Sequence, residues 1–283
     1  IKVLPDRAHD CQSHYGMAKE IAGLLGLTFK DSSQYFKPIE GSAANLKIDI
    51  QTGLCRRYMG RIIRGVKIGP SPDWVKNYLE SIGQRSINNI VDATNLIMYD
   101  IGQPTHAFDA KKLASEHIIV KALDTGSSIT TLSDEVKTLN PGEMVISDEL
   151  NILAIAGVKG GKHAEVDADT TDIVIEVANF DPVSVRKTAR RLNILTDSAK
   201  RFENDLSPEL AGFGMKELTG LIVEMCPDAI FEDVVDVYQS PQEKHELAFD
   251  VSEVGKKIDA NISADEIENI LKRYAFEYTK DGE

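Results

Sequence analysis

His106 is a first candidate for chemistry because of the backbone that leads to it. This lone histidine follows a Gly-Gln-Pro corner at residues 102–104. Proline fixes its own φ, so a residue placed just after such a turn has little backbone freedom. A site residue is presented to a ligand in this way, and so is a structural histidine with satisfied nitrogens. Both interpretations remain open from this stretch alone.

Glu176 is a second candidate because it interrupts an apolar run. It lies in the segment IVIEVA at 173–178, where strict alternation places it on one face with Val174 and Ala178. A carboxylate in this position either reaches solvent or acts as a partly buried acceptor directed into a pocket. The sequence leaves these two interpretations open.

Two further motifs suggest ligand binding but lack the required pattern. The loop GVKGGKH at 157–163 has three residues, not four, between its first glycine and Gly-Lys, and His163 follows where a P-loop needs Ser or Thr. A bare backbone that approaches a ligand or a strand fits this loop better than ATP binding. His9, Cys11 and His14 lack a second ligand cluster, which favours ordinary turn residues over a metal site.

Two clusters of cations leave a choice between a solvated surface and a contact with phosphates. In the first cluster the alternatives are a solvated strand face and a phosphate-backbone contact. In the second they are an exposed basic helix face and an RNA backbone contact. The clusters consist of Arg56, Arg57, Arg61, Arg64 and Lys67, and of Arg186, Lys187, Arg190, Arg191, Lys200 and Arg201.

The composition is that of a packed globular protein. The chain has 283 residues, 42% hydrophobic and 27% charged, which suits about two domains. Its net charge of −13 argues against a surface that is basic throughout. The three cysteines are far apart, so we expect no disulfide framework and a reducing cytoplasm. No signal peptide or apolar run long enough for a membrane span is present, and both chain ends suggest an excised fragment.

The elements that must position the candidate residues alternate irregularly between helices and short strands. This pattern favours an α+β fold with mixed or antiparallel sheets and packed helices. Residues 31–42 form a polar connector, and the pattern changes again after 240. We expect strands at 51–69, 117–122, 128–132, 144–147, 152–156 and 172–177, and helices near 13–26, 71–83, 88–102, 181–192, 207–225 and 263–271.

Four motifs in order resemble the beta subunit of bacterial phenylalanyl-tRNA synthetase. They are INNIVDATN to GQPTHAFD at 87–109, AGVKGG at 156–161, IEVANFDPVSVR at 175–186 and TDSAKRFE at 196–203. The resemblance implies the fold of the editing domain in that subunit. It divides the chain into the end of a preceding domain (1–30), a tRNA-editing domain (31–240) and the truncated start of a winged-helix-like domain (241–283).

The resemblance also implies an activity, the hydrolysis of Tyr-tRNA(Phe), while the whole enzyme attaches phenylalanine to tRNA(Phe) using ATP. The family's catalytic positions fall on His106 and Glu176. Its editing pocket falls on Thr94, Asn95, Gly160, Glu176, Thr196 and Ser198. We predict that Thr94, His106, Gly160, Glu176 and Ser198 share one pocket. Ser198 is a departure, because the family often has alanine there, and Asn204-Asp205 replaces a common Arg-Gly pair.

The implied partners are the alpha subunit, in an α2β2 tetramer, and tRNA(Phe), with no membrane. The resemblance implies no cofactor or metal in this fragment. ATP and Mg²⁺ serve the whole enzyme, whose magnesium-linked acidic motif is expected beyond Glu283. The alternative function is a non-catalytic scaffold of the beta subunit that positions tRNA.

Overall fold

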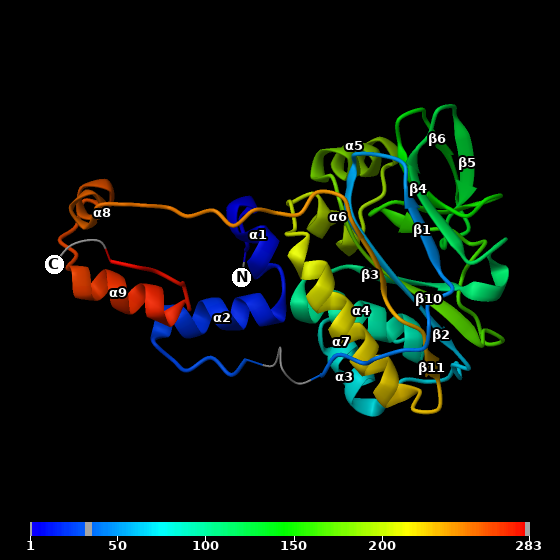
Figure 1. The fold of residues 1–283 in the computed structure, drawn as a ribbon, viewed down its shortest axis with the longest axis horizontal. Helices are drawn as coiled ribbons and strands as arrows, with labels where there is room; N and C mark the ends of the chain where they lie inside the picture. The colour runs from blue at the N-terminus through cyan, green and yellow to red at the C-terminus, as the bar shows by residue number, and fades with distance from the viewer. Residues whose placement is uncertain (1, 32–35, 281–283) are drawn as a thin grey trace.

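A computed structural model of the chain describes residues 2–31 and 36–280, and its body contains two five-stranded sheets (Figure 1). In the first, called here the antiparallel sheet, the strand order is β11-β2-β10-β3, and β12 also pairs with β2. All of its pairings are antiparallel. Its strands are β2 (Cys55–Arg64), β3 (Thr105–Asp109), β10 (Asp172–Phe180), β11 (Ile230–Phe231) and β12 (Val235–Tyr238).

The second sheet, called here the mixed sheet, has the order β1-β4-β7-β8-β9. Strand β1 runs parallel to β4, and the remaining neighbours are antiparallel. A separate hairpin joins β5 (Ser127–Thr130) to β6 (Val136–Leu139). The strands of the mixed sheet are β1 (Lys47–Ile50), β4 (His117–Ala122), β7 (Met144–Ser147), β8 (Ile152–Ile155) and β9 (Lys159–Gly160). The predicted α+β class is therefore confirmed.

Hydrophobic cores lie on both faces of the antiparallel sheet because side chains alternate along its strands. The core toward the mixed sheet contains Val174 and Ala178 of β10, with Ile118 and Ile146 of the mixed sheet. The core on the other face contains Ile173, Ile175 and Val177, packed with residues of α4 and α7. Strand β10 is thus covered on both sides.

Helices α3 (Asp73–Ser81), α4 (Asn89–Ile101) and α7 (Glu209–Met225) supply the helical layer of this second core. The Asn88 side chain accepts hydrogen bonds from two backbone amides at the start of α4. Gly102, the last residue of the helix predicted near 88–102, ends α4 with φ of 87°, a left-handed conformation that glycine adopts without steric cost. The short 3₁₀ helix η1 (Ala110–Lys112) follows β3.

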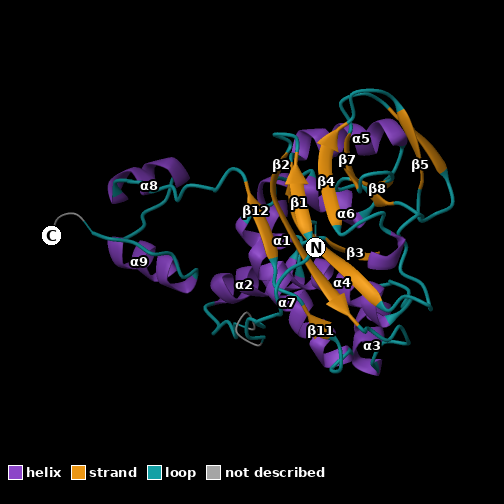
Figure 2. Cartoon of the chain, turned by 45° about the vertical axis from the view of Figure 1, so that its right-hand side comes forward, coloured by secondary structure: helices purple, strands orange, loops and turns teal. Residues whose placement is uncertain are grey.

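Helices α5 (Pro182–Leu192) and α6 (Asp197–Phe202) follow β10 and contact one another. The Asp181 side chain accepts from the Ser184 amide and caps α5 at the start of the helix predicted near 181–192. The terminal helices α1 (Pro5–Cys11), α2 (His14–Leu25), α8 (Val251–Ile258) and α9 (Ala264–Arg273) complete the set found in the described ranges. Helices α8 and α9 stand apart from the body at the end of a long connection (Figure 2).

Several local predictions are wrong. The sequence at Pro5-Asp6-Arg7 suggests a turn, but Pro5 begins helix α1. Ser71 does not cap α3, because its hydroxyl donates to Asp92 at 2.6 Å. The strand-like text before Lys280 forms no strand, and the polar connector at 31–42 lies partly outside the described residues. Strands β1, β3, β6, β9, β11 and β12 and helix α8 were not predicted.

Arg57, Arg61 and Arg64 of the first basic cluster form neither a solvated face nor an accessible phosphate site. Arg61 is 2% exposed, and its guanidinium donates to the carbonyl of Glu232 at 2.5 Å. Arg57 bonds Asp236 through two nitrogens, and Arg64 forms an ion pair with Glu232 at 2.6 Å. Both interpretations therefore fail for these arginines, because the fold uses their charges to fasten β2 to neighbouring segments.

Within residues 2–31 and 36–280, no helix is long and apolar enough to cross a membrane.

Candidate functional site

His106 and Glu176 lie directly opposite one another on neighbouring strands. In the antiparallel pairing of β3 with β10, the register partner of Glu176 is His106. Residues that are directly opposite project from the same face of a sheet, so both side chains point toward the mixed sheet. On the other side of Glu176 the register partner is Gly60 of β2. Strand pairing thus brings together His106 and Glu176, which are seventy residues apart in the sequence.

Glu176 is buried in an apolar wall. Its residue surface is 6% exposed, so the solvent-facing interpretation is wrong. None of the described hydrogen bonds reaches its carboxyl group, and burial raises its pKa to about 8. A buried carboxyl group without a described partner is costly for folding, so packing alone does not explain Glu176.

Tyr58 and Cys55 of β2 face the same core as Glu176 and feel its charge, and neither was predicted as a site residue. Both are buried, and the Tyr58 hydroxyl has no hydrogen-bond partner among the described residues. Burial, and secondarily the negative charge of Glu176, raises the pKa of Tyr58 and of Cys55. The wall around Glu176 therefore holds a second polar group without a partner. The odd position of a tyrosine hydroxyl on an inward strand face was the available signal.

The imidazole of His106 is covered on one side by bare backbone. A Cβ atom added to Gly160 of β9 would lie 2.8 Å from His106 Cε1 and 3.0 Å from Nε2. The ring also packs edge-to-face on Phe108, with 4.7 Å between centroids. Glycine at 160 is therefore required for the close approach of β9, the edge strand of the mixed sheet, to β3, the edge strand of the antiparallel sheet.

Burial also decides the charge of His106. It lowers the pKa of the imidazole to about 4, so the ring is neutral at pH 7. A neutral imidazole offers one donor and one acceptor. No ring nitrogen of His106 takes part in the hydrogen bonds found among the described residues. His106 as a whole residue is half-buried, and its two ring nitrogens are left for a ligand to bond.

Thr196 and Ser198 fasten α6 to the loop that carries Gly160. The Thr196 hydroxyl donates to the carbonyl of Val158 at 2.8 Å and also caps α6 by accepting from the Ala199 amide. The Ser198 hydroxyl donates to the carbonyl of Gly157 at 3.3 Å. Ser198 thus has a structural partner at this edge of the candidate site.

Thr94 and Asn95 lie on α4, at the margin of this arrangement. The carbonyl of Thr94 accepts a hydrogen bond from Thr105, the neighbour of His106, at 3.2 Å. Asn95 is half-buried, and its side chain makes none of the described hydrogen bonds. The structure thus brings Glu176, His106 and Gly160 together and attaches Thr94, Thr196 and Ser198 to neighbouring segments. That all of them share one pocket stays a prediction.

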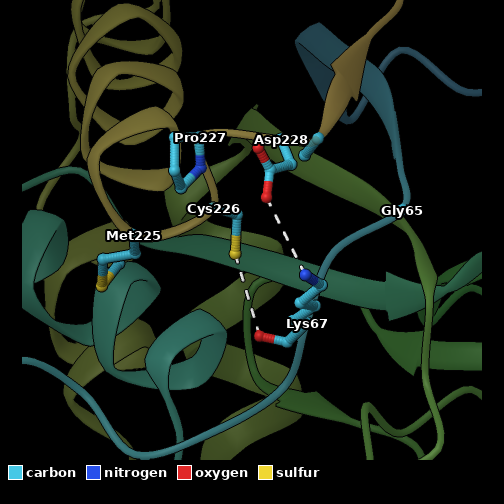
Figure 3. Close-up of a pocket in the computed structure, with 7 residues that line it drawn as sticks. Gly65, Lys67, Met225, Cys226, Pro227 and Asp228 are labelled. Carbon is cyan, nitrogen blue, oxygen red and sulfur yellow. Dashed lines mark hydrogen bonds and ion pairs between the residues drawn. The ribbon is translucent and has the colours of Figure 1, made fainter.

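A pocket elsewhere in the fold is separate from these residues. It lies beyond the end of β2 and is lined by Cys226, Lys67 and the segment after α7 (Figure 3). Lys67 Nζ lies 3.8 Å from Asp228 Oδ2 across it. No predicted site residue lines this pocket. In the described part of the chain no group of three His, Cys, Asp or Glu side chains is arranged to hold a metal ion, and the three cysteines are free and buried.

A comparison with protein-family models identifies the part of the chain that holds the candidate site. Residues 54–227 match the family model of the B3/4 domain, a range that holds both sheet partners of Glu176 and every predicted site residue. The chain therefore belongs to the B3/4 domain family.

Comparison with individual proteins gives a more specific result than the domain family. The chain is 37% identical over 285 residues to the phenylalanine–tRNA ligase beta subunit of Fusobacterium nucleatum, covering 100% of this chain and 36% of that protein. It is 39% identical over 280 residues to the same subunit of Carboxydothermus hydrogenoformans, covering 99% of this chain and 35% of that protein. The resemblance drawn from the motifs is thereby confirmed, and the chain spans about a third of the length of these relatives.

A solved structure gives a weaker likeness. It is an N-terminal fragment of the phenylalanyl-tRNA synthetase beta subunit from Pyrococcus horikoshii, with a TM-score of 0.43 and 13% sequence identity. The likeness covers 95% of this chain and 74% of that one.

Proposed function

We propose that this chain carries out tRNA editing, the hydrolysis of the ester that joins tyrosine to tRNA(Phe). The observation that carries the proposal is Glu176, a buried carboxyl group without a described hydrogen-bond partner, held directly opposite a neutral histidine. Homology to phenylalanine–tRNA ligase beta subunits supports the choice of amino acid and tRNA. In this proposal Glu176 reads the side chain, and His106 works near the ester.

A buried hydrogen-bond acceptor such as Glu176 is suited to distinguishing tyrosine from phenylalanine. Tyrosine differs from phenylalanine by one hydroxyl, and an apolar synthetic pocket rejects an added hydroxyl only weakly. A site built to bond that hydroxyl rejects the analogue without it by roughly 10⁴–10⁵. Bound phenylalanine leaves the Glu176 carboxyl unpaired, at a cost of about 1–3 kcal/mol. The orphaned hydroxyl of Tyr58 lies in the same wall and adds a second polar group.

Protonation of Glu176 is coupled to this recognition. With a pKa of about 8, the empty site holds mainly the neutral acid at pH 7. A phenol that donates to the carboxylate favours the charged form, so binding of tyrosine lowers this pKa. Recognition by the charged form therefore strengthens as the pH rises toward 8.

The chemical step is attack of water on the ester carbonyl. The bond to the terminal ribose oxygen breaks, that oxygen takes a proton, and free tyrosine leaves. The neutral ring of His106 orients the water or holds the ribose hydroxyl through one nitrogen. Positioning and donors directed at the developing oxyanion supply most of the rate enhancement in such reactions.

The wider assignments follow from the same homology. We propose that the chain works with the alpha subunit in an α2β2 enzyme, in the cytoplasm, on tRNA(Phe). ATP and Mg²⁺ belong to the attachment of phenylalanine at the alpha subunit, so we expect no Phe-dependent ATP–pyrophosphate exchange by this chain alone. The division into residues 1–30, 31–240 and 241–283 stays part of the proposal.

A scaffold without catalysis is the second candidate, and Ser198 is the observation that favours it. Its hydroxyl lies at the edge of the site and bonds the Gly157 carbonyl, at a position where the resemblance implies alanine. Deacylation assays separate the two candidates. In the enzyme assembled from full-length alpha and beta subunits, editing predicts that Tyr-tRNA(Phe) is hydrolysed much faster than Phe-tRNA(Phe). Hydrolysis of both at the spontaneous rate supports the scaffold.

A further inference from the structure

Helix α5 presents cations that the fold does not neutralise. Arg186, Lys187 and Arg190 are exposed, and no ion pair to any of them is found among the described residues. The chain has 45 acidic and 32 basic residues, so acidic partners are abundant. Arg191, the next residue of the same helix, does have one, since it bonds Glu143 through two nitrogens. The three free charges therefore form a local basic face on an acidic protein.

Helix stability does not explain this face. Like charges four residues apart, such as Arg186 and Arg190, repel one another on a helix surface, and so do Lys187 and Arg191. The helix dipole favours cations only in the last turn, which contains Arg190 and Arg191. Arg186 and Lys187 precede that turn. An external anion would offset the repulsion between these charges, which neither the helix dipole nor a described ion pair does.

The face lies beside the candidate site. The opposite, buried side of α5 includes Val185, whose Cγ2 lies 2.9 Å from the position of a Cβ added to Gly157. Gly157 begins the loop that continues to Gly160 against His106, and α6 holds the same loop through Ser198. Helices α5 and α6 are neighbours at the same side of the body (Figure 1). A polymer bound along the outer side of α5 is therefore close to the segment that borders the site.

We propose that the outer face of α5, formed by Arg186, Lys187 and Arg190, binds backbone phosphates of the acceptor end of the tRNA while its aminoacylated terminus occupies the site. The inference rests on the proposed function, which requires such a polymer to reach His106. Arginine matches phosphate geometry with two parallel donors, and lysine adds a point charge. The three side chains are positioning residues, because they contact the RNA backbone away from the ester.

The first test is binding of uncharged, fluorescently labelled tRNA(Phe) by the enzyme assembled from full-length subunits. The triple variant Arg186→Gln, Lys187→Gln, Arg190→Gln is compared with a matched variant, Lys244→Gln, Lys256→Gln, Lys257→Gln, which removes three exposed charges near and within α8. Each phosphate contact contributes about 0.7–0.9 to the slope of log Kd against log salt, so loss of three contacts in the α5 variant should lower the slope by roughly two to three. The matched variant should keep the parent slope. Equal thermal midpoints establish that both variants are folded.

The second readout is deacylation of Tyr-tRNA(Phe). For the α5 variant the loss should fall on KM rather than on kcat, and the ratio of Tyr to Phe hydrolysis should stay that of the parent. An unchanged salt slope overturns the proposal. If the α5 variant keeps the slope but loses association with the alpha subunit, the face binds an acidic protein surface instead. Because the binding test needs no hydrolysis, an inactive parent enzyme overturns the proposed function and leaves the α5 test valid.

Discussion

The two faces of strand β10 are both buried, yet they differ in chemistry. Toward α4 and α7 the strand presents Ile173, Ile175 and Val177, each with no exposed surface. Toward the mixed sheet it presents Val174 and Ala178, with Glu176 between them. An aliphatic side chain at 176 would satisfy packing as it does at 175 and 177. The difference indicates that the first face is built for stability and the second carries a group that costs stability.

Moving the carboxyl group to the other face is expected to have the largest effect. Val177→Glu should destabilise the chain by more than about 4 kcal/mol, because the new charge has no partner among apolar residues. Glu176→Leu, one residue away, should stabilise it by about 1–3 kcal/mol. Guanidinium unfolding followed by circular dichroism measures both. If the two substitutions change stability in the same direction, the contrast between the faces is wrong.

The charge of Glu176 should also appear in the pH dependence of stability. Its pKa is raised to about 8 by burial, above the ordinary value that it has in the unfolded chain. The folded state therefore binds a proton that the unfolded state releases, and stability falls as the pH rises toward 8. Relative to Glu176→Gln, the parent should lose about 1.4 kcal/mol per pH unit between the ordinary glutamate pKa and 8, and nothing further above 8. A pH-independent difference between the two proteins would show that the carboxyl group is not desolvated.

The close contact between Gly160 and His106 tests whether the face of β10 toward the mixed sheet takes part in the reaction. In Gly160→Ala the new methyl group meets His106 and Leu132 at 2.8 Å, so the imidazole or β9 must move. A displacement of about 1 Å at a catalytic group costs roughly 10² in rate, which deacylation kinetics detect. Gly69→Ala is the matched control, since its Cβ meets no heavy atom within 4 Å. Equal deacylation rates for the two variants would show that the position of His106 does not matter for the reaction.

Ser198→Ala should have the smallest effect. It removes the hydrogen bond to Gly157, which is worth about 0.5–1.5 kcal/mol of stability, and leaves Glu176 and His106 in place. The editing rate should therefore change little, and unfolding together with deacylation measures both quantities. A large gain in editing on removal of this hydroxyl would mean that Ser198 holds the parent in an inactive, scaffold-like state.

Features set by local sequence could be predicted. The end of α4 at Gly102 and the start of α5 at Asp181 agree with the predicted helix limits, because a cap depends on a few neighbouring residues. Ser263 likewise accepts from the Glu266 amide at the start of α9, as its spacing predicts. The α+β class followed from the irregular order of helices and strands.

Features set by long-range pairing could not be predicted. His106 was expected in a corner, and it lies in β3, whose strand character comes from pairing with β10. The burial of Glu176 was undecided in the sequence because the covering sheet comes from other parts of the chain. The sequence could not show that the arginines of β2 are paired within the fold, because their partners, such as Asp236 and Glu232, lie far along the chain.

Deacylation of Tyr-tRNA(Phe) and Phe-tRNA(Phe) by Glu176→Ala and its parent tests the central claim most directly. The account predicts that hydrolysis of Tyr-tRNA(Phe) falls and that the Tyr/Phe rate ratio falls with it, because the substitution removes both the bond to the phenol and the penalty for phenylalanine. A catalytic base would lose rate equally for both substrates. Circular dichroism controls for folding. An unchanged Tyr/Phe ratio would contradict the claim that Glu176 reads the side chain.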